Sequence, residues 1–222
     1  MNEAVRVRDL YECNFKYLAP LFDECEYPWE LLLKIKDYIY RLFELKPEGY
    51  TFLKDDVLVG KDVTVSETAT VIGPAIIGDK TEIRHGAFIR GSVIVCDGCV
   101  IGNSTELKNS ILLSGAQVPH YNYVGDSVLG SRAHLGAGAV CSNLKADGKS
   151  VVIHADAEYE TGLRKVGAFV ADGADIGCGC VLNPGTVVGK RTSVYPLTPL
   201  RGVYPADSIV KAQNTVIPRL EK

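Results

Sequence analysis

The sequence predicts an all-β solenoid, a parallel β-helix of hexapeptide repeats, with a small α-helical region at its N-terminal end. Two observations lead to this fold class: an aliphatic residue recurs every six positions, and a small or β-branched residue usually follows it four positions later. The 22 glycines among 222 residues support it, because many of them fall where such coils turn. An ordinary sandwich of short strands would not hold this register.

The six-residue period holds through most of the chain. It runs without slippage through Val59, Val65, Val71, Ile77, Ile83, Ile89, Val95, Ile101, Leu107 and Leu113. After a break around Pro119 and a longer interruption, it continues through Leu129, Leu135, Cys141, Val170, Ile176, Leu182, Val188, Val194 and Leu200. Three hexads would close one triangular coil, whose aliphatic residues point inward and stack on those of the neighbouring coils at about 4.8 Å.

Two segments fall outside this repeat. Residues 1–55 are rich in tyrosine and phenylalanine, and an apolar helical pattern runs from Pro28 to about Glu44. We expect residues 1–55 to form a helical cap over the first coil, followed by the solenoid over residues 56–222. The second segment, residues 143–166, is polar and without phase, which predicts a loose functional loop that leaves the solenoid.

Composition excludes several classes of protein. The net charge of −3 is unlike that of a nucleic-acid-binding protein, and no apolar run approaches the roughly 18 residues of a membrane helix. The first ten residues contain no apolar core of a secretory signal. The seven cysteines are odd in number and scattered, which favours reduced thiols. We therefore expect a cytoplasmic protein without nucleic-acid or membrane partners.

Spacing alone points to a polar site. Arg90 and Lys108 lie 18 residues apart, and each directly follows an inward aliphatic residue. They should stack one above the other, about 4.8 Å apart, as unpaired cations that share an anion such as phosphate. His120 should also face outward, and histidine suits a base that works near neutral pH.

Several motifs resemble a known family. FIRG, GNSTELKNS and PHYNYVGDSVLGSRAHLGAGAVCSN resemble the acetyltransferase domain of the bifunctional enzymes that make UDP-N-acetylglucosamine. NLKADGK and TGLRKVGAFVADGADIGCGCVLNPGT are similar to the archaeal sugar-phosphate versions. The resemblance covers roughly residues 71–195. It implies a left-handed β-helix, a homotrimer, acetyl-CoA as co-substrate and an amino-sugar 1-phosphate as acceptor.

The resemblance also assigns roles to individual residues. It implies that His120 is the general base and that Asn143 lies near the reacting amine. The residues that would bind the sugar phosphate are Arg90, Lys108, Tyr123, His134 and Lys149. The residues that would contact acetyl-CoA are Ala137, Cys178 and Pro196. At four positions the family commonly has another residue, which bears on the sugar more than on the reaction; these are His134, Leu144, Cys178 and Pro196.

Other interpretations are weaker. Cys96 and Cys99 form a CxxC motif, but their phase sends one outward and one inward, so we expect no zinc site. The four histidines lack the short spacing of the hexapeptide-repeat carbonic anhydrases, and we expect no metal. No glycine-rich phosphate loop precedes Val59, so nucleotidyl transfer by this chain is not expected. A protein related to the sugar-1-phosphate nucleotidyltransferases without their catalytic domain, or a non-catalytic scaffold, remain the alternatives.

Overall fold

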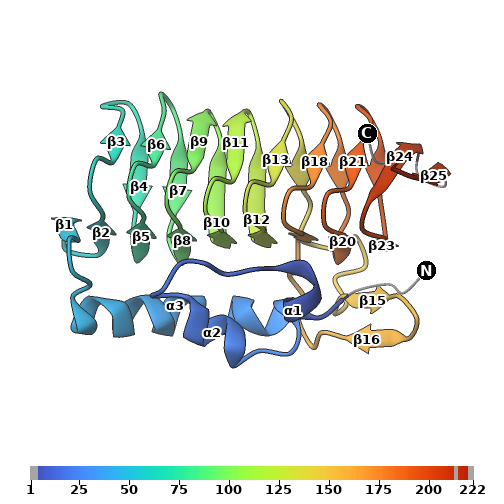
Figure 1. Ribbon diagram of the computed structural model, residues 1–222, viewed down its shortest axis with the longest axis horizontal. Helices are drawn as coiled ribbons and strands as arrows, with labels where there is room; N and C mark the ends of the chain where they lie inside the picture. The colour runs from blue at the N-terminus through green and yellow to red at the C-terminus, as the bar shows by residue number, and fades with distance from the viewer. Residues whose placement is uncertain (1–4, 213–214, 220–222) are drawn as a thin grey trace.

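The protein is a β-helix with a helical region along one flank (Figure 1). The computed structural model describes residues 5–212 and 215–219. Strands pair in parallel with their equivalents one coil later, and Val57 pairs with Ala75, which pairs with Val93. These partners are 18 residues apart, so the coil inferred from the sequence is confirmed.

The coil has three faces. Face 1 contains β2 (Val57–Val59), β5 (Ala75–Ile77), β8 (Val93–Val95), the second halves of β10 (Glu106–Leu112) and β12 (Tyr123–Leu129), β17 (Ala168–Val170), β20 (Thr186–Val188) and β23 (Val203–Tyr204). Face 2 contains β3 (Thr64–Val65), β6 (Glu82–Ile83), β9 (Val100–Asn103), β11 (Gln117–His120), β13 (His134–Leu135), β18 (Asp175–Ile176), β21 (Ser193–Val194) and β24 (Ser208–Ala212). Face 3 contains β4 (Thr70–Ile72), β7 (Phe88–Arg90), the first halves of β10 and β12, β14 (Val140–Cys141), β19 (Val181–Leu182) and β22 (Pro199–Leu200).

An antiparallel strand lies at each end of the solenoid. β1 (Thr51–Lys54) pairs with β2, and β25 (Thr215–Pro218) pairs with β24. Each of these strands covers a sheet edge that would otherwise expose unpaired backbone groups.

The predicted register is wrong by one residue at Leu113. Leu112 points into the solenoid, while Leu113 packs on the helical side. The reason is that β10 and β12 turn the edge between faces 3 and 1 with one residue fewer, so Val93 pairs with Ser110 only 17 residues later. Asn109 and Asp126 make these tight turns with φ of 46° and 48°. Both side chains belong to residue types that tolerate the left-handed region.

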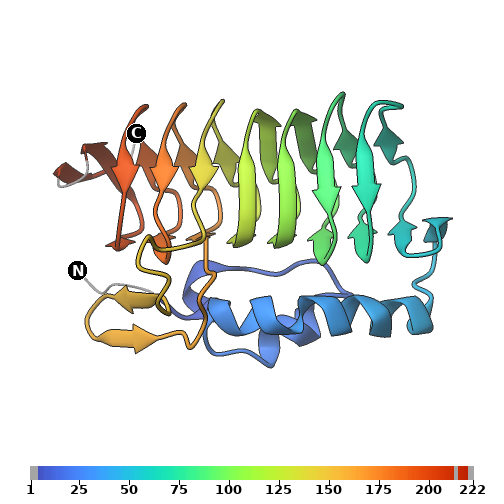
Figure 2. The ribbon, with the colours of Figure 1, turned by 180° about the vertical axis from the view of Figure 1, so that it is seen from behind.

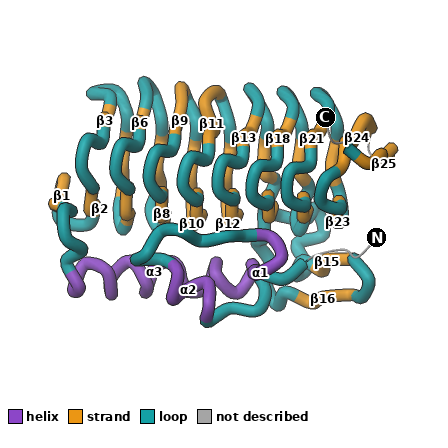
Figure 3. Tube along the Cα trace, in the orientation of Figure 1, coloured by secondary structure: helices purple, strands orange, loops and turns teal. Residues whose placement is uncertain are grey.

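The N-terminal region contains α1 (Val7–Leu10), α2 (Ala19–Asp23) and α3 (Pro28–Leu45). The helix predicted from Pro28 is confirmed, but its expected place over the first coil is not what the structure shows. α3 packs lengthwise against β8, β10 and β12 on face 1 (Figure 3). The physical reason is that face 1 carries outward apolar side chains that need cover, namely Leu58, Ile76, Ile94, Ile111, Val128, Phe169 and Val187.

The interruption at residues 143–166 is more ordered than expected. It forms an antiparallel hairpin of β15 (Val152–His154) and β16 (Glu158–Glu160), close to the start of α3 (Figure 2). Tyr159 of the hairpin packs against Tyr27 and Trp29, with ring centroids 5.4 and 6.1 Å away. The helical region therefore holds the hairpin against the solenoid. Among the described residues, no helix is long and apolar enough to cross a membrane.

Candidate active site

One edge of the solenoid, between faces 2 and 3, carries four of the predicted site residues in a single column. We call it the His120 edge. In six successive coils one residue turns this edge with positive φ, namely Gly86, Ser104, Tyr121, Gly138, Gly179 and Leu197. The residues just before them form the column His85, Asn103, His120, Ala137, Cys178 and Pro196. Backbone bonds tie the column together: Gly138 N–H donates to the His120 carbonyl at 3.0 Å, and Gly179 N–H donates to the Ala137 carbonyl at 2.8 Å.

The His120 side chain is exposed, while its backbone is fixed. The backbone N–H of His120 donates to Asn122 Oδ1 at 3.1 Å. Asn122 is buried and donates through Nδ2 to the carbonyls of Gly136 and Ala139 at 2.8 and 3.1 Å. Within the described part of the chain, the imidazole has no hydrogen-bond partner, so its nitrogens are available to a ligand.

The next edge, between faces 3 and 1, carries a second polar cluster, which we call the Lys108 edge. Asp126 lies at its centre with a side chain only 6% exposed. Its carboxylate accepts bonds from Lys108 Nζ at 3.2 Å, from Asn109 Nδ2 at 2.9 Å and from Asn143 Nδ2 at 2.5 Å. A buried carboxylate with three donors holds its partners in one geometry.

The two cations on this edge are paired, contrary to the expectation from spacing. Arg90 and Lys108 do occupy equivalent positions in successive coils, because Ile89 pairs with Leu107. However, Arg90 forms an ion pair with Glu106 at 2.5 Å, and Lys108 pairs with Asp126. Any anion bound here would have to share these cations with two carboxylates.

Tyr123 is positioned by its neighbours on the Lys108 edge. Its hydroxyl accepts a bond from Asn143 Nδ2 at 3.1 Å. Its ring lies over Gly125, where a Cβ atom would come within 2.3 Å of the Tyr123 oxygen. Burial raises the pKa of the Tyr123 hydroxyl, and the nearby Asp126 raises it further. The group is therefore a neutral phenol that can donate to a bound ligand.

The structure does not bring the remaining predicted residues into either cluster. His134 lies on face 2, where its Nδ1 is 2.8 Å from Asp175 Oδ1. Lys149 is exposed on the inserted segment, and its backbone N–H donates to Asp147 Oδ1 at 3.0 Å. Among the described residues, no hydrogen bond or ion pair joins Lys149 to Arg90 or Lys108.

The described residues include the CxxC motif and the residue types that could bind a metal ion. Cys99 lies inside the solenoid and Cys96 faces the helical region, so the CxxC side chains diverge as their phase predicts. No group of three or more His, Cys, Asp or Glu residues in the described ranges is arranged to hold a metal ion.

The sequence of this chain is similar to those of several known proteins. The family model of the GMPPB C-terminal domain matches residues 71–160. A bifunctional sugar-1-phosphate nucleotidylyltransferase/acetyltransferase from Sulfurisphaera tokodaii is 32% identical over 151 residues, which cover 60% of this chain and 38% of the relative. The bifunctional protein GlmU from Methanocaldococcus jannaschii is 30% identical over 170 residues, which cover 74% and 41%. The solenoid is thus similar to the GMPPB C-terminal domain over residues 71–160 and to part of these two bifunctional proteins.

These matches cover only part of each relative. The chain spans about two fifths of the length of the two curated relatives named above. Among solved structures, the acetyltransferase domain of PglB from Neisseria gonorrhoeae, in complex with acetyl coenzyme A, is 20% identical with a TM-score of 0.34. It covers 73% of this chain and 57% of that one. This likeness is too low for a residue-by-residue comparison.

Proposed function

We propose that the protein is an acetyl-CoA-dependent N-acetyltransferase that acts on an amino-sugar 1-phosphate in the cytoplasm. The name of the relative from Sulfurisphaera tokodaii combines a sugar-1-phosphate nucleotidylyltransferase with an acetyltransferase, which supports this proposal. The observation that carries the proposal is the division of polar residues between two edges of the same face. His120 stands in one column with Ala137, Cys178 and Pro196, while Lys108, Tyr123 and Asn143 meet at the other edge.

The two edges suggest two halves of a site. The His120 edge places the small residues Ala137, Gly138, Cys178 and Gly179 in the coils after the exposed imidazole, which suits a long thin co-substrate. The Lys108 edge offers cations and polar groups, which suit a sugar phosphate. Because the edges of a triangular coil point apart, we propose that they meet between subunits of a homotrimer. Sedimentation analysis should then give a mass three times the 24.0 kDa of the chain.

The proposed reaction is a direct acetyl transfer. His120 takes a proton from the sugar ammonium, and the freed amine attacks the thioester carbonyl. The C–N bond forms and the C–S bond breaks. The nitrogen gives up its second proton to the leaving thiolate of coenzyme A, and His120 later releases the first proton to solvent. Backbone amides at the turns of the His120 edge would stabilise the tetrahedral oxyanion. Tyr123 and Asn143 would orient the sugar, with Arg90 and Lys108 on its phosphate.

The test is the release of free thiol from acetyl-CoA with glucosamine-1-phosphate or galactosamine-1-phosphate. His120→Ala should lower kcat by about 10²- to 10⁴-fold, because general base catalysis contributes that much. His85→Ala is the matched control, since His85 is exposed in the same column and bonds Thr68 at 2.7 Å. A turnover unaffected by His120→Ala would overturn the mechanism.

Two alternatives have distinct outcomes in this assay. No thiol release with either sugar phosphate, although the protein is folded, would favour a non-catalytic scaffold. Formation of pyrophosphate from UTP and a sugar 1-phosphate would favour the nucleotidyltransferase activity that the names of its relatives include. All seven cysteines are unpaired, which supports the cytoplasmic assignment.

A further inference from the structure

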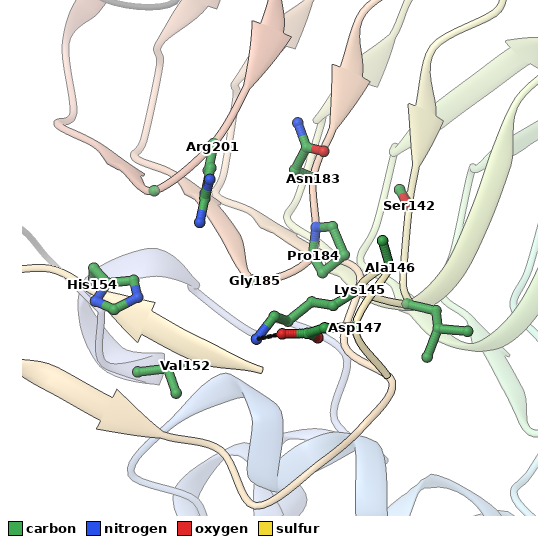
Figure 4. A pocket seen from close by; sticks show the side chains of 12 residues that line it. Ser142, Lys145, Ala146, Asp147, Val152, His154, Asn183, Pro184, Gly185 and Arg201 are labelled. Carbon is green, nitrogen blue, oxygen red and sulfur yellow. Dashed lines mark ion pairs between the residues drawn. The ribbon is translucent and has the colours of Figure 1, made fainter. Parts of the chain in front are cut away.

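A cavity of about 910 Å³ lies on the Lys108 edge, between the inserted segment and the later coils (Figure 4). The inserted segment contributes Lys145, Asp147 and His154 to its wall. The solenoid contributes Asn183 and Arg201 from two successive coils. None of the residues that bond Asp126 lines the cavity, although Ser142 and Leu144 of its lining flank Asn143.

Among the described residues that line the cavity, Arg201 is the one cation without a charged partner. Lys145 pairs with Asp147 at 3.4 Å, and His154 lies 3.2 Å from Glu158. The guanidinium of Arg201 extends into the open space between the two walls (Figure 4). Within the described part of the chain, this side chain has neither an ion pair nor a hydrogen bond. An unpaired guanidinium in a concave site is suited to bidentate binding of a phosphate oxygen pair.

The position of Arg201 relative to Lys108 limits what the cavity can bind. Leu107, Val124, Cys141, Leu182 and Leu200 occupy equivalent positions in successive coils. Arg201 therefore stands in the same column as Lys108, four coils further on, which is about 19 Å at the spacing of β-strands. One small sugar phosphate cannot contact both residues. The volume of the cavity is also larger than a lone phosphate requires, and it lies in the range of pockets that bind nucleotide-sized ligands.

We propose that this cavity, the hairpin pocket, binds the pyrophosphate of a nucleotide through Arg201. Asn183 and Lys145 would complete the polar lining, while the apolar surface of Pro184 and Val152 would contact the base or the chain of the ligand. Two ligands share this chemistry: coenzyme A and a nucleotide sugar. The coenzyme A case rests on the acetyl transfer proposed above, and the nucleotide sugar case does not.

The test is titration calorimetry of the full chain with coenzyme A, UDP-N-acetylglucosamine and inorganic phosphate as separate probes. Arg201→Gln removes the charge, and Ala146→Trp fills the cavity from an exposed position on the inserted segment. Arg132→Gln is the matched control, because Arg132 is an exposed arginine on the edge between faces 1 and 2. Arg201→Gln should weaken nucleotide binding by about 10- to 100-fold, in line with a lost charge-assisted hydrogen bond. Ala146→Trp should also weaken it, because the indole occupies the space of the ligand. The control should bind as the wild type does.

The probes separate the two ligands. Weakening confined to coenzyme A identifies the pocket as a co-substrate site, and weakening confined to UDP-N-acetylglucosamine identifies a nucleotide-sugar site. Equal affinities of wild type and Arg201→Gln for every probe would overturn the proposal, and so would an effect on inorganic phosphate alone. The calorimetric test measures binding and does not depend on turnover. If nucleotide binding depends on Arg201 but the protein transfers no acetyl group, the proposed function is refuted and the hairpin pocket is not.

Discussion

Gly125→Ala should disturb the candidate site through Tyr123 alone. The new Cβ atom would lie 2.3 Å from the Tyr123 oxygen, whereas ordinary contact begins at 3.4 Å. The phenol must therefore move by about 1 Å, and it would weaken the 3.1 Å bond from Asn143. A displacement of this size at a reacting centre costs about 10²-fold in rate, or about 2.7 kcal/mol of transition-state stabilisation. Only the far end of a side chain has to move, so the free energy of unfolding should change by less than about 1 kcal/mol.

The assay is kcat/KM for acetyl transfer to an amino-sugar 1-phosphate, together with urea unfolding. A double-mutant cycle isolates the route of the effect. Once Tyr123→Ala has removed the ring, Gly125→Ala should cause no further loss of activity. Gly98→Ala is the control, because no atom lies within 4 Å of its Cβ and its φ of 65° makes it costly only in stability.

Two results would refute this reasoning. One is an activity loss by Gly125→Ala that persists in the Tyr123→Ala background. The other is a wild-type kcat/KM for Gly125→Ala in a protein whose acetyl transfer depends on Tyr123. Either result would mean that the position of the Tyr123 hydroxyl over Gly125 does not control the reaction.

Three further predictions concern the buried carboxylate of Asp126, the exposed thiol of Cys178 and two buried thiols. Asp126→Asn should lower the free energy of unfolding by about 2 to 3 kcal/mol in urea, because the partly buried Lys108 loses its charged partner. Cys178 is the one exposed cysteine, so Ellman's reagent at pH 8 should label it first, and acetyl-CoA should slow that labelling. Burial raises the pKa of both Cys99 and Cys141 to about 12. The native state therefore holds protons that the unfolded state loses above about pH 9, and stability should fall between pH 9 and 12 by about 1.4 kcal/mol per unit per thiol. Urea unfolding across that range, with Cys141→Val expected to lessen the slope, checks the sign.

The repeat could be read from the sequence because its physical cause is local. Every inward position needs an aliphatic or small residue, so the period of six marks the coil directly. The shortened turns at Asn109 and Asp126 could not be read in this way, since one fewer residue leaves the composition unchanged. The inward position moves from Leu113 to Leu112. Because both residues are leucines, the hydrophobic pattern does not reveal this change.

The site was predictable only in part. The 18-residue spacing correctly predicted that Arg90 and Lys108 occupy equivalent positions in successive coils. It did not predict their partners, because Glu106 lies on a neighbouring strand and Asp126 in a buried turn. Asp126 was missed because a buried acid at an edge has no sequence pattern of its own. Arg201 does have a sequence pattern, since it follows an inward leucine just as Lys108 does. It was missed because the other wall of its cavity comes from the inserted segment, whose position the repeat does not predict.

The helical region along face 1 changes how the solenoid should unfold. In a bare stack of repeats, each coil touches only its neighbours, and unfolding can begin at an end and spread coil by coil. Here the N-terminal segment reaches the later coils, because Asp172 accepts the Glu12 N–H at 2.7 Å and Lys190 pairs with Glu12 at 3.0 Å. α3 then runs back along β8 to β12. Loss of the coils that contain Asp172 and Lys190 would thus release the segment around Glu12, so the N-terminal region and these later coils should melt in a single transition rather than unfold independently.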